Sequence, residues 1–114
     1  FTGFELMEGK KNVAAFLFET VPSILSYSQH RVTNDIIEIE SGQASASWYV
    51  DCPVVFYPDN KLNINGSAFI AGRYEEEYIF EDGEWKWVRI VALLDTVQQF
   101  DKNWNDARQI IKNR

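Results

Sequence analysis

The sequence predicts an α+β fold: an N-terminal helix, a curved four-stranded antiparallel sheet shaped as a cone or half-barrel, and a C-terminal helix. Three observations predict it. An apolar stripe at helical spacing opens the chain, strand-like segments separated mostly by short turns follow, and a second helical stripe ends it. The chain has 114 residues and an apolar fraction of 46%. We therefore expect one domain, residues 1–114, with a real core.

The first helix is expected over residues 9–22. Val13 and Phe16 belong to an apolar stripe with helical spacing. The residue before a proline avoids helical angles, so Pro22 predicts that the helix ends near Thr20.

Four strands follow, and "ESGQ" and "EDGE" are turn signals between neighbouring strands. Pro53 predicts a bulge, bend or edge position, and Gly72 predicts a bend or a close approach of two backbones. Strands joined by short loops pair antiparallel. The strands are expected over residues 31–40, 43–57, 67–80 and 85–95.

The second helix is expected over residues 96–114. Thr96 and Gln99 match a capping box at its start. An apolar stripe that includes Phe100 and Trp104 steps by three and four residues. This stripe must be buried, either on the open face of the sheet or against another subunit.

The charge pattern excludes several classes of partner. The net charge is −6 and the eleven Lys and Arg residues are scattered, which argues against a nucleic-acid interface. No apolar run is long enough to span a membrane. The single cysteine, Cys52, excludes an internal disulfide and a multi-cysteine metal site. We expect a cytoplasmic protein that uses no metal.

Two stretches resemble the SnoaL-like domains of the nuclear transport factor 2-like superfamily. "SQHRVTNDIIEIESGQASASWYV" (28–50) is similar to their histidine–asparagine motif, strand, turn and alanine-bearing strand, and "GRYEEEYIFEDGEWKWVRI" (72–90) to their Asp-Gly hairpin. The resemblance runs from about residue 3 to residue 94. It implies a cystatin-like cone with a pocket for a hydrophobic ligand, and a homodimer paired through the sheet. Members include polyketide cyclases, ketosteroid isomerases and scytalone dehydratase, so the fold does not fix the function.

Among these enzymes, scytalone dehydratase gives the nearest catalytic comparison. Its first catalytic histidine matches His30, its second histidine matches Val54, and its pocket asparagine falls near Tyr74. Its remaining catalytic residues lie on N-terminal helices that have no counterpart before Phe1. The resemblance therefore implies a fragment, or a site completed by the C-terminal helix or a partner subunit.

His30 is the first catalytic candidate, because imidazole takes or gives a proton at neutral pH. Strand alternation places Val32 and Asn34 on its side, and Asn34 is a candidate ligand contact. The structural alternative is a histidine that only satisfies hydrogen bonds in the fold.

Glu76 is the second catalytic candidate. It shares a face with Tyr74 and Tyr78, and Trp87 is expected to share a face with Arg89 on the next strand. If both faces point inward, Glu76 pairs with Arg89 and acts as a general base within an aromatic pocket. The alternative is a solvated acidic run on an exposed strand.

The sequence thus predicts a small-molecule pocket in which Trp48, Tyr74 and Trp87 position a hydrophobic ring. As an enzyme, the protein would be a cofactor-independent dehydratase, isomerase or cyclase acting by proton transfer beside a carbonyl. The alternative is a non-catalytic ligand-binding or dimerisation module.

Overall fold

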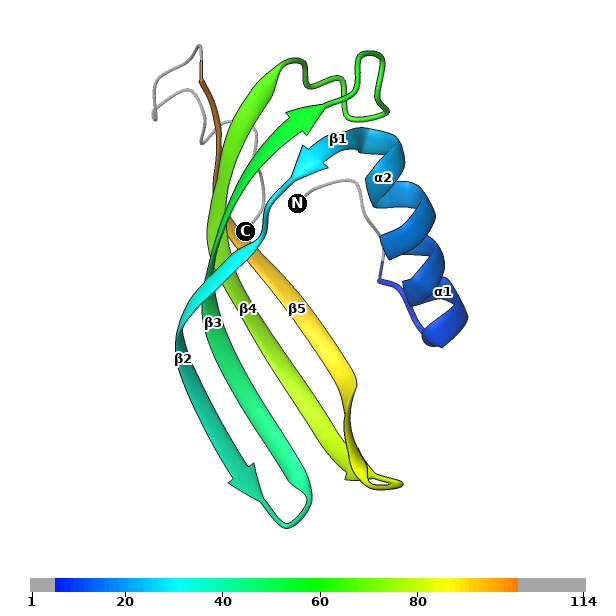
Figure 1. Cartoon of the computed structure of the whole chain (residues 1–114), viewed down its shortest axis with the longest axis vertical. Coiled ribbons are helices and arrows are strands. Elements are labelled where there is room, and N and C mark those ends of the chain that lie inside the picture. The colour runs from blue at the N-terminus through cyan, green and yellow to red at the C-terminus, as the bar shows by residue number, and fades with distance from the viewer. Residues whose placement is uncertain (1–5, 101–114) are drawn as a thin grey trace.

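The computed structural model describes residues 6–100, with a helical segment on one side of a long curved sheet (Figure 1). The helical segment has three consecutive parts: α1 (Lys10–Ala15), a π-helical turn η1 (Phe16–Thr20) and α2 (Val21–Ile24). The predicted end near Thr20 is wrong, because the helix continues through Pro22. Pro22 lies in the first turn of α2, directly after the π-helical turn. The π-helical turn resets the bonding pattern just before it.

The five strands form one antiparallel sheet, which confirms the predicted fold class. β1 and β2 pair with the two halves of β3, and the order continues through β4 to β5. The short β1 was not predicted. The strands are β1 (Leu25–Ser28), β2 (Arg31–Glu40), β3 (Gln43–Phe56), β4 (Ser67–Glu81) and β5 (Glu84–Gln99).

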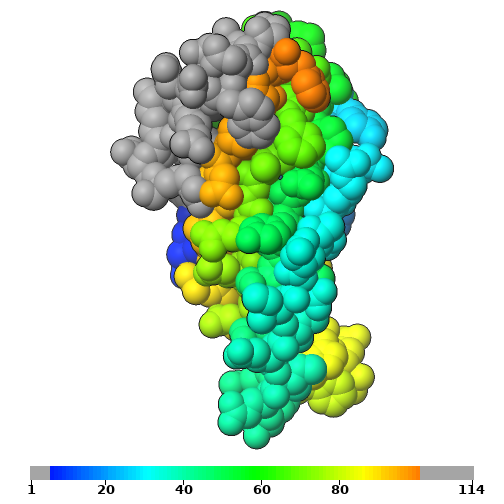
Figure 2. Space-filling view, turned by 90° about the vertical axis from the view of Figure 1, so that its left-hand side faces the viewer, coloured from blue at the N-terminus to red at the C-terminus, as the bar shows by residue number. Residues whose placement is uncertain are grey.

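Both predicted hairpin turns are present. Ser41 and Gly42 have φ values of 49° and 77°, and Asp82 and Gly83 have φ values of 55° and 80°. Positive φ at both central residues is typical of the type I′ turn, whose twist matches that of the flanking strands. The two hairpins form the lower end of a molecule 47 Å long (Figure 2).

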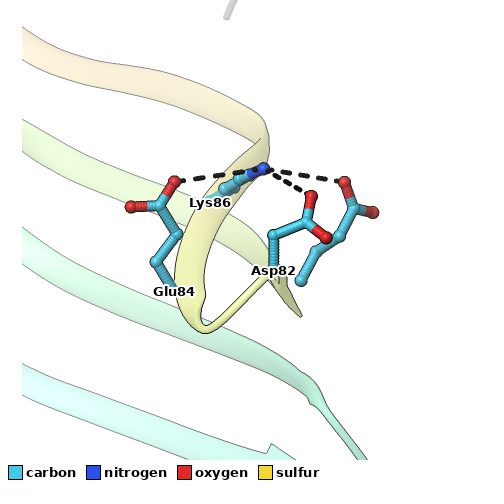
Figure 3. Close-up of polar contacts among 4 residues, drawn as sticks. Asp82, Glu84 and Lys86 are labelled. Atoms are coloured by element: carbon cyan, nitrogen blue, oxygen red, sulfur yellow. Dashed lines mark ion pairs between the residues drawn. The ribbon is translucent and has the colours of Figure 1, made fainter.

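Lys86 stands at the centre of an ion-pair cluster at the β4–β5 turn (Figure 3). Its Nζ lies 3.7 Å from Glu81, 3.5 Å from Asp82 and 3.9 Å from Glu84. All four side chains are well exposed, so these pairs contribute little to stability.

The core lies where the helix joins the sheet. Ile24 of α2 packs with Cys52, Val54 and Phe56 of β3, and with Ala68 and Val97 from the neighbouring strands. We call the sheet face that carries these residues the inner face, and the opposite one the outer face. The core occupies only the upper half of the inner face.

A bulge in β2 changes the strand's alternation. Thr33 pairs with Tyr49 and Ile36 with Ser47, so β2 has one extra residue there. Asn34, with φ 56°, lies within the bulge. As a result, Val32, Ile37 and Ile39 all pair with inner-face residues of β3.

Gly72 confirms the predicted close approach. A Cβ built on it would lie 2.4 Å from the backbone oxygen of Leu93 and 2.8 Å from the Cα of Leu94. Asp95 is the extra residue of a second bulge at this point, since Ala71 pairs with Thr96 and Gly72 with Leu94.

The predicted start of a C-terminal helix is wrong. β5 continues to Gln99, and Thr96 and Val97 are buried in it, paired with Ala71 and Ile70. Cross-strand burial therefore overrides the capping pattern. The rest of the predicted helix, residues 101–114, lies outside the described residues. None of the helices within residues 6–100 is long and apolar enough to cross a membrane.

Candidate functional site

The carboxylate of Glu76 is the centre of a polar cluster on the lower half of the inner face. Trp48 Nε1 donates a hydrogen bond to Glu76 Oε2 at 3.1 Å, and Tyr78 Oη donates to the same oxygen. Glu76 pairs with Ala46 on β3 and Ile90 on β5. The small Ala46 side chain allows the indole of Trp48 to reach across from β3.

Tyr74 extends this cluster toward the core. It pairs with Trp48 and lies two residues before Glu76 on the same face. Burial raises the pKa of the Tyr74 phenol, and the nearby Cys52 and Glu76 raise it further. Tyr74 is therefore a neutral phenol at neutral pH, able to donate a hydrogen bond. Burial likewise raises the pKa of the Cys52 thiol, consistent with its place in the core.

Trp87 supplies the most accessible ring of the site. It pairs with Tyr78, with ring centroids 6.4 Å apart and planes inclined by 30°. Its exposed fraction is 64%. Other exposed apolar side chains of the inner face are Ile90, on the same strand as Trp87, and Ile37 and Ile39, on β2 at the opposite edge of the sheet.

Arg89 does not join this cluster, and the expectation that it shares a face with Trp87 is wrong. Trp87 pairs with Tyr78 but Arg89 pairs with Glu77, so Val88 is an extra residue. This bulge turns Arg89 to the outer face, away from Glu76. The acid–base pair expected from strict alternation is absent from the described residues.

Arg89 instead lines a shallow groove of about 280 Å³. On the outer face the groove is lined by polar and acidic residues, among them Glu38, Ser45, Ser47, Glu75 and Glu77. Ile36, Ala46 and Glu76 also border it. The acidic residues outnumber Arg89, which suits neither an anionic ligand nor a hydrophobic ring.

His30 lies apart from Glu76. It is exposed in the break between β1 and β2, where the backbone N–H of Gln29 donates to Pro53 O at 3.1 Å. Arg31 pairs with Asp51, whereas Glu76 pairs with Ala46, five residues further along β3. At about 3.3 Å per residue this is a separation of about 17 Å along the strand.

Asn34 lies between His30 and the Glu76 cluster along the sheet, at the bulge opposite Trp48. The bulge breaks the alternation expected from His30 through Val32 to Asn34. The structure thus brings together Trp48, Tyr74, Glu76 and Trp87, and leaves His30, Asn34 and Arg89 outside that group.

Tyr78 is a member of the cluster that the predicted site omitted. Its position two residues after Glu76 was the available signal, because alternate residues of a strand share a face. Its hydrogen bond depends on side-chain geometry that alternation does not reveal.

The fold is similar to that of several solved structures. A hexachlorocyclohexane dehydrochlorinase (LinA) of type 2 has a TM-score of 0.72 and 20% identity, over 85% of this chain and 63% of that chain. The LinA-type3 enzyme from Novosphingobium barchaimii LL02 has a TM-score of 0.70 and 22% identity, over 84% of this chain and 63% of that chain. The Kfla4162 protein from Kribbella flavida has a TM-score of 0.65 and 15% identity, over 77% and 59%.

This chain therefore spans less than two thirds of the length of these proteins, and at such identities the likeness shows the fold alone. Curated protein sequences give no match. The model of the SnoaL-like domain family, in contrast, matches residues 1–91, most of the chain. With its open α+β sheet and aromatic inner face, the chain belongs to the SnoaL-like domain family.

Proposed function

We propose that this protein binds a hydrophobic, ring-bearing small molecule on its inner face and catalyses a cofactor-free proton transfer beside a carbonyl group. The reaction would be a dehydration, an isomerisation or a cyclisation. The observation that carries the proposal is the Glu76 carboxylate, held by Trp48 and Tyr78 on an open aromatic surface. Apolar surface of this kind, with a few convergent polar groups, is typical of small-molecule sites.

In this proposal His30 is the general acid or base, and Glu76 is a second proton-transfer group. Trp48, Tyr74 and Trp87 position the ring, while Asn34 contacts the ligand from the edge strand. Arg89 is left out, because the bulge at Val88 turns it to the outer face.

The similar structures support proton-transfer chemistry. Two of them are named hexachlorocyclohexane dehydrochlorinases. Removal of hydrogen chloride from a ring includes the loss of a proton from carbon, which requires a base.

The first test is His30→Ala, with Gln29→Ala as the matched control at the neighbouring exposed position. Ring-bearing carbonyl compounds are screened by NMR for exchange of the hydrogen beside the carbonyl in deuterated water. Loss of a general base typically lowers turnover by about 10²–10⁴-fold. We expect this loss of turnover in His30→Ala and not in Gln29→Ala. Ligand affinity and melting temperature should stay nearly unchanged, because His30 is exposed. Unchanged exchange in His30→Ala would disprove the assignment.

The distance between His30 and Glu76 favours a second candidate function, a non-catalytic ligand-binding or dimerisation module. A single small ring does not reach both groups. Ring compounds that bind with no hydrogen exchange in any variant would support this module.

We further propose a homodimer, formed through the upper half of the outer face. Tyr27, Tyr49 and Val55 are exposed there, and Tyr27 pairs with Val55 in the sheet. Large apolar side chains exposed on one sheet face are typical of an interaction surface.

We also propose that residues 1–114 act as one domain and that the protein is cytoplasmic. The single, buried, free Cys52 is compatible with a reducing compartment. Limited proteolysis tests the first statement, and cell fractionation tests the second.

A further inference from the structure

The Glu76 carboxylate makes no ion pair with any cationic side chain in the part of the chain that the structure describes. The ion pairs found within residues 6–100 all involve Lys86 at the hairpin turn. The two groups that hold Glu76, the indole of Trp48 and the phenol of Tyr78, are neutral donors. Arg73 is on the same strand as Glu76 and Arg89 is on the adjoining β5, but they pair with Tyr49 and Glu77 and so lie on the outer face.

Aromatic rings surround this carboxylate. Tyr74 and Tyr78 flank it along β4, while Trp48 and Trp87 face them from the two neighbouring strands. The ring of Trp87 is 64% exposed and lies 6.4 Å from that of Tyr78. The negative face of an aromatic ring attracts a cation, and tryptophan does so most strongly.

The surroundings also decide which kind of cation fits. Within the described residues no group of three metal-ligating side chains is present, so a bare metal ion has too few ligands. Ile90 pairs with Glu76 and offers exposed apolar surface beside the carboxylate, and exposed Ile37 and Ile39 lie on the same face, one strand beyond Ala46 and Ala44. A cation that also carries alkyl or aryl groups would cover this surface. The net charge of −6 adds a general attraction for cations.

We propose that Glu76, with the rings of Trp48, Tyr74, Tyr78 and Trp87, binds an organic ammonium ion that bears an apolar group. This deepens the proposed function, because it names the class of ligand for the same inner face. It requires that face to bind small molecules, and it does not require His30 to act as a base.

The experiment compares two probes of nearly identical shape, phenyltrimethylammonium and the neutral tert-butylbenzene. Binding is followed by NMR at the indole N–H signals, with Glu76→Gln as the test variant. Glutamine keeps an acceptor for Trp48 and Tyr78 and removes only the charge. Glu75→Gln is the matched control, since it makes the same change in net charge on the outer face.

We expect the wild-type protein to bind the ammonium probe at least about tenfold more tightly than the neutral probe. We expect Glu76→Gln to lose that preference and Glu75→Gln to keep it. If Glu76→Gln does not fold, Trp87→Leu is expected to weaken ammonium binding several-fold, while Trp85→Leu, on the ring pair with Phe80, leaves it unchanged.

The contrary results separate this inference from the proposed function. Equal affinity for both probes would overturn the ammonium site and leave a ring-binding face in place. If Glu75→Gln and Glu76→Gln weaken binding of the ammonium probe equally, the effect comes from net charge alone. That result would also overturn the ammonium site. Hydrogen exchange that depends on His30, together with equal affinity for the two probes, would uphold the catalytic role of His30 and overturn the cation site.

Discussion

Tyr74 links the core to the candidate site, and its ionisation is a property that a titration can measure. Its phenol pKa is raised above the usual 10.0, chiefly by burial and further by Cys52 and Glu76. A raised pKa means that the folded protein holds this proton more tightly than the unfolded chain does. Below pH 10 both states keep the proton, so the full stabilisation is present there.

We therefore expect the free energy of unfolding to fall as the pH rises above about 10, because the unfolded chain then loses the Tyr74 proton first. Urea unfolding between pH 8 and pH 11 measures this fall. Tyr74→Phe is expected to make the fall shallower, and Tyr57→Phe, which removes an exposed tyrosine just after β3, is the control. Cys52 acts with the same sign from its usual value of 9.0 upward, because its pKa is also raised. An equally steep fall in wild type and Tyr74→Phe would show that Tyr74 does not contribute.

The bulge in β2 decides which side chains the edge strand presents. Val32 lies before the bulge and Ile37 and Ile39 after it, yet all three pair with inner-face residues. Without the extra residue, Val32 and Ile37 would lie on opposite faces, since alternation has a period of two. The left-handed backbone of Asn34, at φ 56°, makes this change of phase possible.

Asn34→Val is therefore expected to destabilise the protein by about 1–3 kcal/mol, because a β-branched residue strongly disfavours positive φ. Asn34→Gly is expected to be neutral or slightly stabilising at the same position. Thr33→Val, at the adjacent extended position, is the control and should cost little. Chemical denaturation gives the differences, and hydrogen exchange of residues 36–39 shows whether the register survives. A stable Asn34→Val protein with unchanged exchange would mean that the bulge does not need this conformation.

The bulges also mark where sequence reasoning fails. The turns at Gly42 and Gly83 were predictable, because short polar turns between apolar runs have few alternatives. The inward alignment of Trp48, Tyr74 and Glu76 was also predictable, because no bulge lies between them and their partners. The predicted face of Arg89 was wrong because the alternating pattern of the sequence does not reveal the extra residue of the bulge, Val88.

The helix boundaries failed for related reasons. A π-helical turn allowed the helix to continue past Pro22, and pairing with Ile70 and Ala71 kept residues 96–97 in a strand. At Pro22 the change to π-helical bonding outweighed the helix-ending effect of proline. At residues 96–97 the pairing of β5 with β4 outweighed the helix-capping pattern. The distance between His30 and Glu76 in the folded protein likewise could not be read from their spacing in the sequence.

Across the whole molecule, the two sheet faces differ in character. The inner face is apolar and aromatic around Glu76, whereas the lower outer face carries a row of carboxylates: Glu38, Glu75 and Glu77. In a two-fold pairing the same surface patch meets its own copy. Pairing centred on that acidic row would place like charges together, so the exposed patch of Tyr27, Tyr49 and Val55 above it is the better interface.

This placement predicts a dimer that one charge can break. At micromolar concentration we expect sedimentation equilibrium to give twice the monomer mass of 13.2 kDa. Val55→Glu would bury a charge in the interface, where its cross-strand neighbours Tyr27 and Ser67 carry no positive charge, and we expect it to weaken association at least about tenfold. Ile39→Glu adds the same charge on the inner face, at a side chain 67% exposed, and should leave the dimer intact. A wild-type monomer would refute the dimer outright. Loss of the dimer in Ile39→Glu alone would move the interface to the inner face, where it would compete with the ligand proposed for Glu76.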